Sequence, residues 1–285
     1  MKLRNRLLAS GLFILAVLFV MVAKTTLVSN AVTVNTTQEA ILNNQFKNTI
    51  GAFVLSDLKN THNIRYNTER CNQRFTPEST FKIPNSLIAL ETGVIKDDNV
   101  VTTYDKEKHP PESWWPKTWT QDHNLRTAIK NSVVWYYQEI AKKVGKENYN
   151  KYLEQFQYGN KDVSGLIDQF WLSSSLKISP NEEVEFLKKF YKGELPVSKR
   201  TTDIVKDILV LEKTDDYKLS GKTGLSSQQD DGKRLGWFVG YLERKDNVYF
   251  FATNLEDTSR EALIPKRVEI TKRILTELGL LEQKN

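Results

Sequence analysis

The chain has 285 residues, of which 41 are basic and 35 acidic, and a formal net charge of +6 at pH 7. Four of the basic residues lie in the first 31 positions, before the first acidic residue, so the rest of the chain has 37 basic and 35 acidic residues. So small an excess lacks the basic footprint of a nucleic-acid-binding protein. The single cysteine, Cys71, allows no internal disulfide, and the scattered histidines His62, His109 and His123 lack the ligand spacing of a zinc site.

The N-terminal segment has the order of parts found in a secretory signal peptide. Three basic residues precede an apolar run over residues 7–23, and small residues follow at positions 29–31. We therefore expect residues 1–31 to be a signal peptide. This run of 17 residues, which includes Ser10 and Gly11, is also at the short limit for crossing a bilayer. An uncleaved anchor, tethering the protein to the outer side of the cytoplasmic membrane, is the alternative.

The first elements predicted along the chain are a β-hairpin and a helix. Two runs rich in β-branched and aromatic residues, 51–58 and 62–67, flank a short polar turn and predict the hairpin. Apolar residues at helical spacing over residues 83–90 then predict a helix, and Gly93 would end it.

The second half of the chain predicts another helix and a clearer hairpin. The helix covers residues 180–192, with Ser179 as its N-cap, Glu182 completing a capping box and Gly193 at its end. The hairpin joins residues 234–243 to residues 247–256 through a three-residue turn.

An amphipathic pattern over residues 268–281 predicts a last helix. Strands near both ends of the chain with helices between them predict an α+β fold. We expect an antiparallel β-sheet whose edges come from the N- and C-terminal strands and which is flanked by helices. No internal repeat or low-complexity linker divides the chain, which indicates a single folded domain.

The pattern Ser-x-x-Lys occurs three times, at Ser56 and Lys59, at Ser79 and Lys82, and at Ser174 and Lys177. The first pair falls in the hairpin, where residues three apart face opposite sides, and the third has no helix of its own. Ser79 and Lys82 lie where a loop becomes an apolar helix, so one turn places them on the same face. Taken alone, this pair reads as a helix-capping serine with a solvated lysine.

A catalytic role for this pair requires an unusual lysine. A serine hydroxyl is a poor nucleophile until a base takes its proton, and a lysine with an ordinary pKa of about 10.4 is protonated at neutral pH. Lys82 would have to be desolvated or modified, and its apolar neighbours Phe81, Ile83 and Pro84 favour burial. Free backbone N–H groups at the helix start would stabilise an oxyanion. The pair is therefore a candidate for acyl transfer, with Ser79 as the nucleophile.

Two later segments offer residues that such a reaction needs. Ser132 and the two valines after it interrupt a helical pattern and predict a break between two helices. Lys222, Thr223 and Gly224 end a short strand where a ligand or another backbone could approach closely. Alone, Ser132 reads as a helix cap and the second segment as a glycine-rich strand end.

Four short motifs occur in the order typical of the penicillin-recognising serine enzymes. They are Ser79-Thr80-Phe81-Lys82, Ser132-Val133-Val134, Tyr158-Gly159-Asn160 and Lys222-Thr223-Gly224. The chain resembles class D, the oxacillinase-type serine β-lactamases, more than class A. Ser-Val-Val stands where class A has Ser-Asp-Asn, and Tyr-Gly-Asn is typical of class D. The segment from Ser164 to Leu187 is also similar to class D, and the resemblance extends from Phe46 to the C-terminus.

The resemblance implies a mechanism. Ser79 would attack the β-lactam carbonyl and become the acyl-enzyme. Lys82 would be N-carboxylated by carbon dioxide, which converts a cation into an anionic base, and no other cofactor is implied. Trp171 would donate its indole N–H to this carbamate, while Val134 and Leu172 would screen it and gate the arriving water.

The resemblance also implies how the substrate is bound. Ser132 would relay a proton to the β-lactam nitrogen, while Lys222 and Thr223 would polarise the site and bind the substrate carboxylate. The backbone N–H groups of Ser79 and Leu225 would form the oxyanion hole.

Further residues would support the site. Gly224 would complete the substrate-binding end of its strand, and Tyr158 and Asn160 would support the loop that carries the tryptophan. The family has an arginine late in the chain that grips the substrate carboxylate. Counting back from the last helix favours Arg267 for this role, with Arg260 as the alternative.

The sequence is therefore interpreted as an exported class D β-lactamase, periplasmic or secreted, that opens the ring of penicillin-type antibiotics. Residues 32–285 would form its catalytic domain, with an all-helical lobe against the sheet and the active site between them. A penicillin-binding D,D-peptidase and a β-lactam-sensing receptor domain that stays acylated are the alternatives. Trp171 favours hydrolysis over the peptidase, and the short segment before residue 32 leaves little room for the membrane-embedded part of a receptor.

Overall fold

The computed structural model describes residues 37–59 and 62–282. Contacts divide the chain into two compact units, Met1–Gln45 and Phe46–Asn285. In the first unit, residues 37–45 form a helix, and the predicted signal peptide lies outside the described residues. No helix in the described part of the chain is both long and apolar enough to span a bilayer.

The second unit is built on a six-stranded sheet in which every neighbouring pair is antiparallel. The strands are β1 (Ile50–Asp57), β2 (Asn63–Tyr66), β3 (Val210–Lys213), β4 (Tyr217–Leu225), β5 (Arg234–Arg244) and β6 (Val248–Asp257). Across the sheet their order is β2-β1-β6-β5-β4-β3. Both predicted hairpins are confirmed, as β1 with β2 and as β5 with β6.

The expectation that strands from both chain ends form the two edges is wrong for the C-terminal hairpin. That hairpin lies in the middle of the sheet, where β6 pairs with all eight residues of β1. All of β6 except its last two residues is buried, and a strand covered on both faces suits a central position. The edge opposite β2 is β3, a short strand of alternating exposure that the sequence did not predict.

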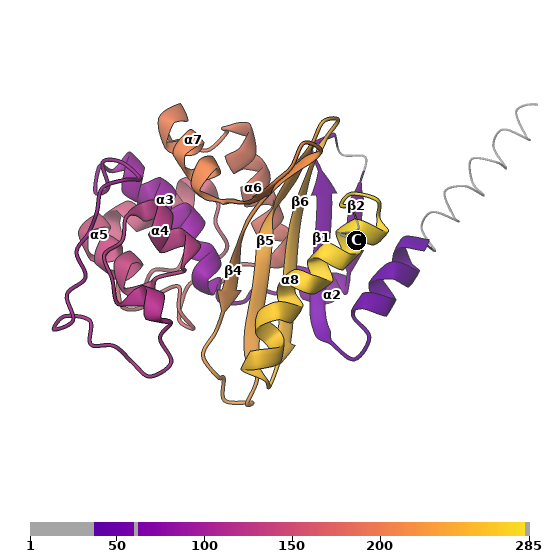
Figure 1. Cartoon of the computed structure of the whole chain (residues 1–285), viewed down its shortest axis with the longest axis horizontal. Helices are drawn as coiled ribbons and strands as arrows, with labels where there is room; N and C mark the ends of the chain where they lie inside the picture. Colours follow the sequence, from indigo (N-terminus) through magenta and orange to yellow (C-terminus); the bar gives the residue numbers. More distant parts are fainter. Residues whose placement is uncertain (1–36, 60–61, 283–285) are drawn as a thin grey trace, which may run out of the picture. The chain divides into compact units, whose positions relative to one another are not determined.

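Helices cover both faces of the sheet (Figure 1). On one face, Leu263 of α8 (Arg260–Glu277) packs so closely that a Cβ on Gly236 of β5 would lie 2.9 Å from it. On the other face, Tyr241 of the same strand contacts the rings of Phe190 and Tyr191 in α6 (Pro180–Lys192). Side chains alternate along a strand, so positions 236 and 241 face opposite sides.

Most of the remaining helices form the predicted helical lobe, which lies beside the sheet in Figure 1. They are α3 (Lys82–Glu91), α4 (Leu125–Lys130), α5 (Val134–Phe156) and α7 (Lys199–Ile208). The short helix α2 (Thr68–Asn72) lies outside this lobe and contacts β1 and α6. α3 packs against α5 and α7 and is buried from its first residue to its ninth. A helix that is buried on all sides forms the centre of a lobe. The predicted α+β architecture is confirmed.

The predicted ends of α6 are also confirmed. Ser179 accepts a hydrogen bond from the Glu182 backbone N–H and completes the capping box, and Gly193 ends the helix with φ 72°. The last helix begins at Arg260, earlier than predicted, because the Ser259 side chain caps it by accepting from the Ala262 N–H.

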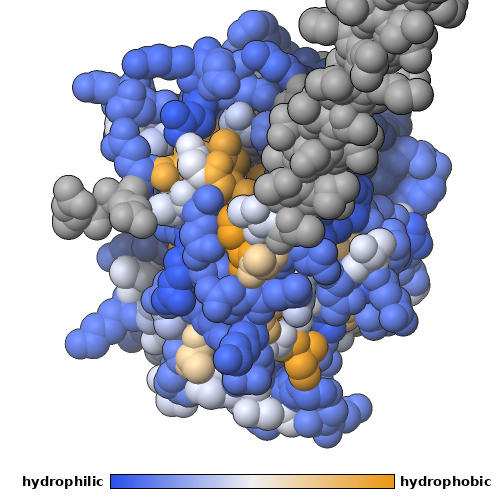
Figure 2. All heavy atoms as spheres, turned by 90° about the vertical axis from the view of Figure 1, so that its right-hand side faces the viewer, coloured by the Kyte–Doolittle hydropathy of each residue, from blue (hydrophilic) through white to orange (hydrophobic). Residues whose placement is uncertain are grey.

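The face of the molecule drawn in Figure 2 is mainly hydrophilic, and hydrophobic residues appear there in small groups between hydrophilic ones. The large apolar side chains are mostly buried, and one cluster of them extends from the sheet into the helical lobe. The core therefore joins the two parts between which the functional motifs lie.

Candidate active site

Ser79 lies in a short 3₁₀ helix, η1 (Glu78–Phe81), which leads directly into α3. Lys82 is the first residue of α3, and its Nζ donates a hydrogen bond to Ser79 Oγ over 2.8 Å. The predicted placement of both side chains on one face of this turn is confirmed.

Lys82 has an environment suited to a base. It is 1% exposed, and its Nζ lies 5.2 Å from the centre of the Tyr137 ring. Burial lowers the pKa of Lys82 to about 7, against the opposing negative charge of Glu78. A substantial fraction of this amine is therefore neutral at neutral pH. The lysines of the other two Ser-x-x-Lys patterns, Lys59 and Lys177, are exposed.

Ser132 lies in the predicted break between α4 and α5, with φ 56°. Its Oγ accepts a hydrogen bond from Lys222 Nζ at 3.0 Å, which joins the helical lobe to β4. Lys222 Nζ also donates to Thr223 O at 3.0 Å. The pKa of Lys222 is well below the usual lysine value, mainly because of burial and further because of the positive charges of Lys82 and Arg267.

β4 ends at Leu225, beside the nucleophile turn. A Cβ on Gly224 would lie 3.1 Å from Pro77 O, so glycine permits this close approach. The buried Arg267 of α8 donates from Nη1 to Gly224 O, whereas Arg260 is partly exposed at the start of α8. Burial, followed by the charge of Arg260, lowers the pKa of Arg267 to about 10. The structure thus brings Arg267 to this strand end.

Trp171 is fully buried, and its ring stacks on Phe81 with a centroid distance of 5.5 Å. Its Nε1 is buried without a hydrogen-bond partner among the described residues, although buried indole N–H groups usually have one. A carbamate on the neighbouring Lys82 would be an acceptor of the right charge, so the residues present fit this group. Val134 and Leu172, the predicted gating pair, are both half-buried.

Asn160 fixes the segment that precedes α6. Its Nδ2 donates to Ser175 O at 2.8 Å, and its Oδ1 accepts from the Lys177 N–H at 2.8 Å. Gly159 has φ 53°, and a Cβ there would lie 2.0 Å from Lys177 O. The Tyr158 hydroxyl donates to α6 rather than to this segment, so the two polar residues of the Tyr-Gly-Asn motif support different elements.

Two buried carboxyl groups beside the nucleophile are not predicted from the sequence. Glu78 directly precedes Ser79, and Glu183 of α6 accepts from Tyr158 Oη at 3.0 Å and lies 2.8 Å from Thr80 Oγ1. Burial raises the pKa of both carboxyl groups, that of Glu183 to about 7. A signal for Glu183 exists, because it lies three and four residues before buried apolar residues of the same helix. Nothing comparable marks Glu78.

Comparison with known proteins gives the class of this site. The family described as the penicillin-binding protein transpeptidase domain matches residues 20–276. The chain is therefore a member of the penicillin-recognising serine enzymes, as the order of its motifs indicates.

More similar relatives define the class within that family. The probable β-lactamase YbxI of Bacillus subtilis is 42% identical over 240 residues, which are 84% of this chain and 85% of that protein. β-Lactamase OXA-48 of Klebsiella pneumoniae is 42% identical over 227 residues, 80% of this chain and 83% of that protein. The crystal structure of the class D β-lactamase YbXI from Nostoc has a TM-score of 0.79 and 43% identity, covering 84% of this chain and 99% of that one. The chain belongs to the class D β-lactamases, which are serine hydrolases of β-lactams, and the predicted family, fold class and enzyme class are confirmed.

Proposed function

We propose that the protein is an exported β-lactamase that opens penicillin-type rings through an acyl-enzyme on Ser79. The observation that carries this proposal is the 2.8 Å hydrogen bond from the buried Lys82 Nζ to Ser79 Oγ. A base carried on Lys82 at this distance can take the hydroxyl proton while the oxygen attacks. The signal-peptide pattern of residues 1–31 supports export.

In acylation, Ser79 Oγ forms a bond to the β-lactam carbonyl carbon, and its proton moves to the base at Lys82. The backbone N–H groups of Ser79 and Leu225 stabilise the oxyanion. As the ring C–N bond breaks, Ser132 delivers a proton to the nitrogen. Lys222, whose Nζ lies 3.0 Å from Ser132 Oγ, supports this relay.

The substrate carboxylate binds at the end of β4. Thr223 offers a hydroxyl, Lys222 offers an N–H donor, and Arg267 offers positive electrostatic potential at the same strand end. Gly224 leaves room for the ligand because it has no side chain. Charge-assisted hydrogen bonds of this kind hold carboxylates most strongly.

Lys82 is proposed to be N-carboxylated by carbon dioxide. The modification needs a neutral amine, and the pKa of Lys82, lowered by burial to about 7, provides one. Trp171 supports the proposal, because its buried Nε1 has no partner among the described residues and would hold the carbamate. The group supplies an anionic base at neutral pH, competent for both acylation and deacylation. Val134 and Leu172 screen Lys82 and control the entry of water.

The fate of the acyl-enzyme separates this function from its rivals. A sensor domain or a D,D-peptidase would form the same adduct and keep it, whereas a hydrolase releases it. We would follow benzylpenicillin by absorbance, and the protein by mass, over one time course with and without bicarbonate. Sustained turnover that bicarbonate enhances is expected, and a stoichiometric burst ending in a long-lived adduct would refute hydrolysis.

Ser79→Ala is expected to abolish both the adduct and turnover, because the variant lacks the attacking oxygen. Ser56→Ala, at another Ser-x-x-Lys pattern, is the matched control and should retain both. An adduct in the Ser79→Ala variant would show that another residue is the nucleophile.

A further inference from the structure

Glu78, the residue directly before the nucleophile, has an unusual backbone conformation. Its φ is 54°, in the left-handed region that is strained for a residue with a side chain. It is also 2% exposed, and a carboxyl group is rarely buried without strong partners. Such a residue persists only where its surroundings hold it in place.

The surroundings of Glu78 are the loop that contains Trp171. The Glu78 N–H donates to Trp171 O at 3.1 Å. Its Oε1 accepts from the backbone N–H and from the Oγ of Ser173, each at 2.8 Å. Ser173 itself has φ 48°. Glu78 therefore holds Trp171 and Ser173, two residues further along the loop, by three hydrogen bonds.

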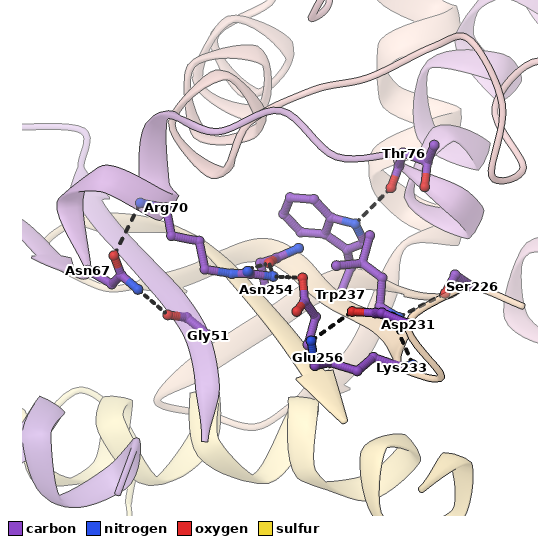
Figure 3. A network of polar contacts seen from close by, with 11 residues as sticks. Gly51, Asn67, Arg70, Thr76, Ser226, Asp231, Lys233, Trp237, Asn254 and Glu256 are labelled. Carbon is purple, nitrogen blue, oxygen red and sulfur yellow. Dashed lines mark hydrogen bonds and ion pairs between the residues drawn. The ribbon is translucent and has the colours of Figure 1, made fainter. Parts of the chain in front are cut away.

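The same oxygen of Glu78 also binds a residue that is fixed to the sheet. It accepts from Thr76 Oγ1 at 2.8 Å. Figure 3 shows the indole of Trp237, from β5, directed at Thr76, with its Nε1 donating to Thr76 O at 3.0 Å. The Trp237 ring packs edge-on against Phe75, over which the guanidinium of Arg70 lies at 4.3 Å. The Thr76 end of the contact is thus anchored in the core, while the Ser173 end is on a loop.

We infer that Glu78 is a positioning residue for hydrolysis of the acyl-enzyme. Its carboxyl oxygen ties Ser173 to the anchored Thr76 and so keeps Trp171, with its unpartnered indole N–H, stacked on Phe81, the residue before Lys82. The inference rests on the proposed function, in which that N–H holds the carboxylated lysine. Ser79 is held by the backbone of its turn, where its carbonyl oxygen accepts from the Lys82 N–H, so acylation depends less on the Glu78 side chain than deacylation does.

Two substitutions of Glu78 distinguish the role of its hydrogen-bonding oxygen from the role of its charge. Glu78→Ala removes the acceptor of all three side-chain hydrogen bonds. Glu78→Gln keeps an oxygen that accepts them and removes only the charge. Ser173→Ala removes one donor from an exposed residue, so it tests the same contact with little risk to folding.

The experiment measures acylation and deacylation of the full chain separately, with benzylpenicillin and saturating bicarbonate. Rapid mixing with mass detection gives the acylation rate, and the decay of the adduct gives deacylation. We expect Glu78→Ala to slow deacylation about 10- to 100-fold and acylation much less, because small misplacements of catalytic groups have effects of this size. Glu78→Gln should restore deacylation, and Ser173→Ala should be intermediate.

Glu91 provides a matched control at the other end of α3. Its carboxylate also accepts hydrogen bonds from a backbone N–H and a hydroxyl, those of Ser198 and Thr201, but it lies far along the helix from Ser79. Glu91→Ala should lower thermal stability without changing the ratio of the acylation rate to the deacylation rate. The inference is overturned if Glu78→Ala deacylates like the wild type or if Glu78→Gln deacylates as slowly as Glu78→Ala. It is also overturned if Glu91→Ala accumulates the acyl-enzyme as Glu78→Ala does. A wild type without turnover would instead refute the proposed function.

Discussion

At the scale of single residues, the unpartnered indole N–H of Trp171 gives a sharp test of the base. Trp171→Phe keeps a ring to stack on Phe81 but removes the donor. If the N–H holds the carbamate on Lys82, acylation should continue and deacylation should fall about 100-fold, so that the adduct accumulates. Protein mass during benzylpenicillin turnover, recorded over a series of bicarbonate concentrations, measures this.

The control for this substitution is Trp114→Phe. Trp114 is half exposed, and its indole N–H donates to Glu112 on the surface, so this variant should respond to bicarbonate as the wild type does. Normal turnover of Trp171→Phe with an unchanged response to bicarbonate would contradict the assigned role of the indole.

A second prediction at this scale concerns the substrate carboxylate. Arg267 is the arginine that reaches Gly224 in β4, so Arg267→Ala should raise KM for benzylpenicillin about tenfold with a smaller change in kcat. Arg260→Ala is the matched control, because Arg260 is partly exposed and is the first residue of the same helix. Steady-state kinetics of both variants decide the assignment, and the reverse ranking would give the role to Arg260.

At the scale of elements, sequence patterns predict what is local. Runs of β-branched and aromatic residues around short turns give both hairpins, helical periodicity gives α3, and the cap residues Ser179 and Gly193 give both ends of α6. The order of strands in the sheet and the short edge strand β3 depend on contacts between distant segments, which no local pattern encodes. For the same reason, Ser79 and Lys82 can be paired from their spacing, whereas Ser173, which binds the Glu78 carboxyl group, lies 95 residues further along the chain.

The Tyr-Gly-Asn turn supplies a prediction for an element. Gly159 combines φ 53° with an approach that would bring a Cβ to 2.0 Å from Lys177 O. Gly159→Ala should therefore cost about 2–4 kcal/mol of unfolding free energy, part from the backbone conformation and part from displacement of the neighbouring segment. Urea unfolding measures the loss.

Gly193 gives the matched control for that glycine. It has φ 72° at the end of α6, and a Cβ added there would have no neighbouring atom within 4 Å. Gly193→Ala should therefore cost only the conformational part, about 1 kcal/mol. Equal losses in the two variants would contradict the steric argument for the Tyr-Gly-Asn turn.

At the scale of the whole molecule, the site is the place where the lobe and the sheet are joined by buried polar groups. Lys222 of β4 reaches Ser132 between two lobe helices, and Glu183 of α6 meets Thr80 and Tyr158 beneath the nucleophile. Buried polar groups of this kind make stability depend on pH, because protonation changes the cost of burying them.

Glu183 should dominate the change in stability with pH between pH 4.5 and 8. Thr80 Oγ1 lies 2.8 Å from both Pro77 O and Glu183 Oε1, and its single proton can serve only one of them. A protonated Glu183 supplies the second hydrogen bond by donating to Thr80 Oγ1. This geometry agrees with the direction of the pKa, which burial raises from 4.5 to about 7.

A carboxyl group with a raised pKa stabilises the fold while it is protonated. Its contribution is complete below pH 4.5 and is lost as the pH rises to about 7.

Glu183→Gln stays neutral and keeps an accepting oxygen, so its stability relative to the wild type should increase by about 3 kcal/mol between pH 4.5 and 8. Urea unfolding of both proteins across this range measures the difference, in which the other titrating groups largely cancel. The neighbouring Glu182→Gln should show little trend over this range, because hydrogen bonds from Arg74 and Ser179 outweigh burial and lower the pKa of Glu182, which moves its effect on stability below pH 4.5. Parallel curves for Glu183→Gln and the wild type would mean that Glu183 is not the group that makes this interior sensitive to pH.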